Sequence, residues 1–139
     1  MIEPVTTTPA GENTYWLYIL SNETFQGPLY LGETIHMPKR LEAHWAGERR
    51  DFAHYHRLDR LVYFETWNCP EKFKARLRRV RNWPRDMRLL LIESLNPEWN
   101  DLGASLFESL GLEYNPPADL HAPRRRGKRL GDGSSELAA

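Results

Sequence analysis

The chain has 139 residues, of which 40% are hydrophobic and 27% charged, a composition that fits one globular domain and excludes a disordered or fibrous protein. Its formal net charge is zero, so a polyanionic partner would have to bind at a local basic surface. The apolar runs, such as residues 89–92, are too short to cross a bilayer, and the first residues lack the pattern of a secretion signal. We therefore expect a cytoplasmic protein with no membrane partner.

The first half of the chain predicts a β-hairpin followed by a helix. Residues 1–13 show no apolar period and are expected to form a flexible lead-in. The aromatic and branched runs 15–20 and 29–34 predict two strands that pair through a loop of several residues. Residues 38–46 predict a helix, because proline suits its first turn and a glycine follows its last residue.

The second half predicts a third strand and three further helices. Residues 60–66 read as a strand, and Pro70 and Pro84 each suit the start of a helix. Asp101 is expected to cap a short last helix that ends at residue 110. The apolar positions expected to face the core are Phe73, Leu77 and Val80 in the first of these helices, and Met87, Leu90, Leu91 and Leu95 in the second.

This order of elements, β-β-α-β-α-α, predicts an α+β fold with a small three-stranded antiparallel sheet flanked by helices. We expect the domain to span residues 14–112. Residues 113–139 are polar, then basic, then rich in glycine and serine, which predicts a disordered tail. The basic end of this tail could add a salt-sensitive attraction to a polyanion.

Four residues on the hairpin and the first helix are candidates for chemistry. Tyr18 and Tyr30 occupy equivalent points of the two hairpin strands, and Arg40 and His44 are four residues apart on one helix face, beside its apolar stripe. The fork of an arginine suits a phosphate group. A positioned tyrosine hydroxyl or histidine can take a proton from water. Taken singly, each residue also has an ordinary explanation, since strand tyrosines are commonly packing residues and a lone helical histidine is commonly on the surface.

The order and spacing of five segments resemble the GIY-YIG nuclease superfamily, and most closely its small single-domain bacterial members. The segments are Leu17-Tyr18-Ile19-Leu20, Leu29-Tyr30-Leu31-Gly32-Glu33-Thr34, Lys39-Arg40-Leu41-Glu42-Ala43-His44, Arg60-Leu61-Val62-Tyr63-Phe64-Glu65, and the stretch from Asn82-Trp83 to Pro97-Glu98-Trp99. The likeness covers about residues 14–102, nearly all of the chain that we expect to be ordered.

The resemblance implies metal-dependent cleavage of a DNA phosphodiester. It implies that Tyr18 and Tyr30 line the site and that one of them activates or positions the attacking water. Arg40 would neutralise the scissile phosphate in the transition state, and His44 would hold or relay a proton. Gly32 would let the chain turn and let a backbone approach the phosphate without a Cβ in the way.

The family also places one glutamate on the helix after the third strand, where it binds a single Mg²⁺. Counted back from Trp83, that position holds Leu77, which cannot ligate a cation that demands oxygen. The nearest substitute carboxylates in the sequence are Glu33, next to the tyrosine-glycine motif, and Glu71, six residues before Leu77. A divalent metal is therefore expected only if one of these carboxylates takes the place of the missing ligand.

A concentration of arginines predicts the surface that meets the nucleic acid. Residues 76–88 contain six arginines against one acid, Asp86, and such a surface can follow a phosphate backbone. The arginines expected to contact DNA are Arg76, Arg78, Arg79, Arg81 and Arg85.

Two functions from different classes fit these observations. The first is a GIY-YIG-type endonuclease acting on DNA phosphodiesters, with catalysis impaired unless a substitute carboxylate binds the metal. The second is a non-catalytic DNA-binding module derived from such a nuclease, which kept the phosphate-gripping Arg40 after losing the metal ligand. The retained tyrosines, arginine and histidine favour the first, and Leu77 favours the second. A protein partner that supplies the ligand stays an open alternative.

Overall fold

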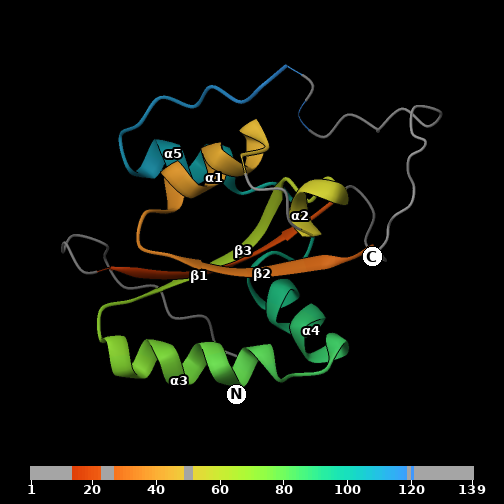
Figure 1. Cartoon of the computed structure of the whole chain (residues 1–139), viewed down its shortest axis with the longest axis vertical. Helices are drawn as coiled ribbons and strands as arrows, with labels where there is room; N and C mark the ends of the chain where they lie inside the picture. Colours follow the sequence, from red (N-terminus) through yellow and green to blue (C-terminus); the bar gives the residue numbers. More distant parts are fainter. Residues whose placement is uncertain (1–13, 23–26, 49–51, 119, 121–139) are drawn as a thin grey trace.

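The computed structural model describes residues 14–22, 27–48, 52–118 and 120. Three strands and five helices occur in this part of the chain (Figure 1). In chain order they are β1 (Tyr15–Ser21), β2 (Leu29–Thr34), α1 (Met37–Ala46), α2 (Phe52–Tyr55), β3 (Arg60–Trp67), α3 (Pro70–Arg81), α4 (Arg85–Leu95) and α5 (Gly103–Ser109). The predicted α+β class with a three-stranded antiparallel sheet is confirmed.

The sheet has the strand order β2-β1-β3, so β1 is central and pairs antiparallel with both neighbours. Tyr18 stands opposite Gly32 on β2 and opposite Phe64 on β3, and these three residues therefore share one face. Leu17 stands opposite Glu33, which places both residues on the other face. The two faces of the sheet have separate roles, because different helices cover them.

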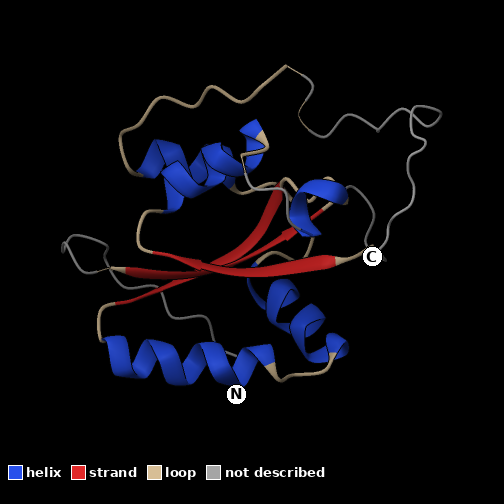
Figure 2. Ribbon diagram, viewed as in Figure 1, coloured by secondary structure: helices blue, strands red, loops and turns tan. Residues whose placement is uncertain are grey.

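Helices α3 and α4 lie on one side of the sheet, and α1, α2 and α5 lie on the other (Figure 2). The side chains on each side form a separate buried cluster. The α1-side cluster consists of Trp16, Tyr18, Leu20, Met37, Leu41, Ala53, Leu58, Leu61, Leu106 and Phe107. The α3-side cluster consists of Leu17, Ile19, Val62, Tyr63, Phe73, Leu77, Val80, Leu91, Ile92 and Trp99. Because successive side chains of β1 point to opposite faces of the sheet, this strand contributes residues to both clusters and is the centre of the fold.

The predicted strands and the predicted starts of α1 and α3 are confirmed. Gly47 ends α1 in the left-handed conformation, with φ of 70°. The predicted inward positions of α4 are partly wrong, since Leu90 is 53% exposed and Leu95 is 38% exposed, whereas Leu91 and Ile92 are buried. Four apolar residues follow one another in this helix, so periodicity alone does not define which face is buried.

Two further differences concern short segments. The sequence predicted no helix at α2, which spans only one turn and has no apolar period. The predicted domain end at residue 112 is too early, because Tyr114 packs against Trp45 and Phe107 with ring centroids 5.7 and 5.4 Å apart. The predicted lead-in and the tail from residue 121 onward lie outside the described residues.

A buried ion pair joins α3 to β3. The Glu65 carboxylate is fully buried and accepts hydrogen bonds from Arg76 through Nε at 2.8 Å and Nη2 at 3.0 Å. It also accepts one from the Tyr63 hydroxyl at 2.5 Å and one from the Trp67 indole at 2.7 Å. Arg76, which we grouped with the DNA-contacting arginines, is therefore a buried partner of Glu65 and not part of a surface.

Candidate functional site

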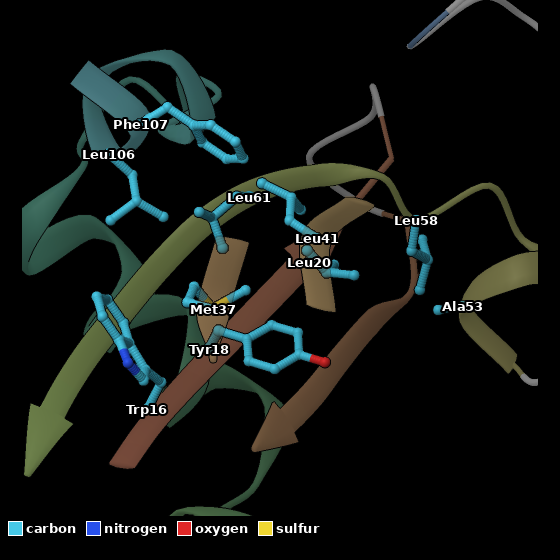
Figure 3. Packing of buried hydrophobic residues seen from close by; sticks show 10 residues of the cluster. All are labelled: Trp16, Tyr18, Leu20, Met37, Leu41, Ala53, Leu58, Leu61, Leu106 and Phe107. Atoms are coloured by element: carbon cyan, nitrogen blue, oxygen red, sulfur yellow. The ribbon is translucent and has the colours of Figure 1, made fainter. Parts of the chain in front are cut away.

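Tyr18 lies at the centre of β1 with its ring in the α1-side cluster (Figure 3). The ring extends across the neighbouring strand, where a Cβ on Gly32 would lie 2.5 Å from the tyrosine hydroxyl oxygen. Real Cβ atoms essentially never come this close, so only glycine fits opposite the ring. Gly32 sits inside β2 and its φ is not positive, so the expected role in a turn is wrong. Its function in this fold is to make room for Tyr18.

Three rings from three elements meet at this point. The Tyr18 hydroxyl hydrogen-bonds His44 Nε2 in the last turn of α1 at 2.9 Å. The Tyr30 ring on β2 stands edge-on to His44 with centroids 5.5 Å apart, and lies 6.1 Å from the Tyr18 ring. We call these residues the Tyr18–Tyr30–His44 cluster. The structure thus brings together two tyrosines and a histidine that are spread over 27 residues of sequence.

The members of this cluster differ in their exposure to solvent. Tyr18 is 0% exposed, whereas Tyr30 and His44 are half-buried. A fully buried hydroxyl cannot touch a substrate bound at the surface. Tyr18 therefore positions His44, and Tyr30 and His44 are the groups that can meet a ligand.

Arg40 lies one helical turn before His44 and on the same face of α1. Its side chain is half-buried, and with the described residues it forms neither an ion pair nor a hydrogen bond. The turn that carries Arg40 is held by His36, whose Nδ1 accepts a hydrogen bond from the Lys39 backbone N–H at 3.4 Å. The position leaves a guanidinium beside the cluster and able to bind an anion.

A pocket of about 300 Å³ borders the cluster at His44. Its polar lining includes His54, Arg57 and Asp59, and the latter two form an ion pair at 3.8 Å. The remaining lining comes from Trp45, Ala46, Gly47, Ala53, Leu58, Pro117 and Leu120. His44 therefore borders both the pocket and the Tyr18 hydroxyl, whereas Tyr30 and Arg40 do not line this pocket.

The carboxylates proposed for a metal do not join this site. Leu77 is 6% exposed and belongs to the α3-side cluster, as its apolar spacing predicted. Glu33 is exposed and alternates onto the sheet face opposite Tyr30. Glu71 is exposed at the start of α3, where its Oε1 accepts a hydrogen bond from the Cys69 thiol at 3.5 Å. Among the described residues, no group of three His, Cys, Asp or Glu side chains is placed to hold a metal ion.

Most of the predicted DNA-contacting arginines are on the surface. Arg78, Arg79, Arg81 and Arg85 are exposed on α3 and α4. Arg85 donates a hydrogen bond through Nη2 to the Gly27 carbonyl at 2.6 Å, which ties the start of α4 to the approach of β2. Arg88, the last arginine of the same basic run, is half-buried on α4.

No family model matches the sequence, and neither the curated proteins nor the solved structures contain a match. The likeness to GIY-YIG nucleases therefore rests on the residues of this chain. Among the described residues, no helix is both long and apolar enough to span a membrane.

Proposed function

We propose that this chain is a GIY-YIG-type endonuclease domain that acts on DNA phosphodiesters. The observation that carries the proposal is the Tyr18–Tyr30–His44 cluster, in which β1, β2 and α1 each contribute one ring around a 2.9 Å hydrogen bond. Arg40 stands one turn away on α1. A phosphate ester is the ligand whose charge and proton-transfer needs match this combination.

Each residue of the site then has a distinct role. The Arg40 guanidinium binds the phosphate and neutralises the charge that grows on its oxygens in the transition state. Tyr30 and His44 position the attacking water and take up its proton. Tyr18 fixes the orientation of the His44 ring from inside the core. This assignment uses only groups of the described chain.

A second function, non-catalytic DNA binding, is favoured by Leu77. The side chain at the family's metal-ligand position is buried in the α3-side cluster, and neither Glu33 nor Glu71 replaces it. Without a carboxylate the domain would still bind a phosphate through Arg40, but it would turn over slowly or not at all. The two functions share the ligand and differ in the cleavage step.

Incubation of the purified protein with supercoiled plasmid and with branched DNA, in Mg²⁺ or Mn²⁺, tests the proposal. The endonuclease function predicts nicking that falls by about 10² or more in both Tyr30→Phe and Arg40→Ala. Binding without any nicking would select the non-catalytic function. Nicking that survives both substitutions would come from a contaminant and would contradict the assignment of the site.

A further inference from the structure

Three guanidinium groups gather where α3 ends and α4 begins. Arg81 is the last residue of α3, Arg85 is the first residue of α4, and Arg88 follows three residues later. Arg88 folds back on the end of α3, where its Nε donates to the Val80 carbonyl at 3.3 Å and its Nη2 to the Arg81 carbonyl at 2.7 Å. We call Arg81, Arg85 and Arg88 the corner arginines.

The charge of the corner arginines is not balanced by neighbouring acids. None of the three forms an ion pair within the described part of the chain, and Asp86 is exposed and likewise unpaired there. The pKa of Arg88 is lowered by burial first and then by the positive charges of Arg81 and Arg85. Arg88 follows Arg85 by one turn of α4 and its Nη2 reaches the Arg81 carbonyl, so the three positive charges are neighbours and repel one another. An anion bound among them would relieve this repulsion.

A purely structural role explains only part of this arrangement. Arg88 satisfies carbonyls at the end of α3, and Arg85 fastens α4 to the Gly27 carbonyl. Arg81 offers only its backbone carbonyl to Arg88, and its side chain has no partner among the described residues. Arg81 therefore places a third positive charge next to two others without a side-chain contact that stabilises the fold.

One contact connects the corner arginines to the strand that carries Tyr30. Arg85 hydrogen-bonds the carbonyl of Gly27, two residues before β2 begins at Leu29. Strand β2 is at the edge of the sheet, with Tyr30 on the side of α1 and the corner arginines on the side of α4. A DNA strand lying along this edge would meet both groups.

We propose that Arg81, Arg85 and Arg88 form a second phosphate site, which holds the DNA backbone where it passes the sheet edge at β2. This inference rests on the proposed function, because it assumes the same DNA ligand. Guanidinium forks bind phosphate oxygens in pairs, and carbonyl contacts fix the directions of two of the three forks, those of Arg85 and Arg88.

The test compares two double variants of the full chain by fluorescence anisotropy with a labelled DNA duplex. Arg81→Gln with Arg85→Gln removes two corner charges and leaves Arg88 to cap α3. Lys72→Gln with Lys74→Gln is the matched control, because it also removes two exposed positive charges, here from the half of α3 that is far from Arg81. Thermal melting of each variant verifies that the fold is retained.

We expect the corner variant to lose about tenfold or more in affinity at low salt, and its slope of log affinity against log salt to fall by about two. The control should lose less than threefold. Equal losses in the two variants would overturn the corner site and leave the proposed function intact. Absence of salt-dependent DNA binding by the wild type would instead contradict the proposed function. Displacement of DNA by polyaspartate at equal charge would overturn the corner site as a phosphate site, because the corner arginines would then bind any polyanion.

Discussion

The ring of Tyr18 occupies the space that a side chain at residue 32 would need, so Tyr18 and Gly32 fit only as a pair. This pairing lets the tyrosine reach across β2 toward α1, where its hydroxyl meets His44. The glycine of the tyrosine-glycine motif is thereby connected to the orientation of a histidine twelve residues later in the chain.

Gly32→Ala is expected to destabilise the protein by about 1–3 kcal/mol, because the new methyl group overlaps the Tyr18 ring. Urea unfolding measures this loss. Combining Gly32→Ala with Tyr18→Leu removes the ring atoms that clash, so the double variant should be more stable than the sum of the single changes predicts. Additive losses would show that the ring does not lie over Gly32.

Tyr18→Phe and Tyr30→Phe should differ in their effect on stability. Tyr18 is buried and its hydroxyl bonds His44, so its loss should cost about 1 kcal/mol of stability. Tyr30 is half-buried, and Tyr30→Phe should change stability by less than about 0.5 kcal/mol while weakening the reaction with DNA. Equal stability losses in the two variants would contradict the separate roles of the two tyrosines.

Arg76→Ala should destabilise the protein by about 3–5 kcal/mol, since it leaves the Glu65 carboxylate buried without its cation. Arg78→Ala is the control, because Arg78 is an exposed arginine of the same helix and should cost less than about 0.5 kcal/mol. Chemical denaturation of both variants distinguishes the buried arginine from the surface one. Similar losses would mean that Arg76 is not buried against Glu65.

The protein should lose stability in alkali through Tyr63. Burial, reinforced by the charge and hydrogen bond of Glu65, raises the pKa of Tyr63 well above its ordinary value of 10.0, while Arg76 opposes this shift. Because the raised pKa favours the protonated phenol in the folded state, the stabilisation is complete below about pH 10 and is lost as pH rises above it.

One proton of this kind gives a slope of up to about 1.4 kcal/mol per pH unit. Unfolding measured between pH 8 and 12 should show this slope in the wild type, and it should be smaller by that amount in Tyr63→Phe. Parallel curves for the two proteins would rule out the Tyr63 contribution.

Local signals were sufficient for most of the fold. The positions of proline and glycine in the sequence located α1 and α3, and the aromatic and branched runs located all three strands. The face of α4 was not predictable, because residues 89–92 are all apolar and fit more than one helical phase. The one-turn helix α2 carries no periodic signal and depends on its packing against the sheet.

The sequence identified candidate site residues, but it did not predict how deeply each of them is buried. The resemblance implied that Tyr18, Tyr30 and His44 share a site, whereas the complete burial of Tyr18 depends on its fit over Gly32. Arg76 looked like its neighbours because a basic run does not reveal which arginine has a buried partner. The usable signal was Glu65, a lone carboxylate in a strand that helices cover.

The most direct test of the account is DNA binding by Arg40→Ala beside Lys39→Ala, measured by anisotropy over a range of salt concentrations. Lys39 is the exposed neighbour of Arg40 on α1 and carries the same charge. We predict that Arg40→Ala loses about tenfold in affinity and about one unit of salt slope, while Lys39→Ala stays within threefold of the wild type. Equal binding by the two variants would show that no phosphate is bound at Arg40, and the proposed site would then be wrong.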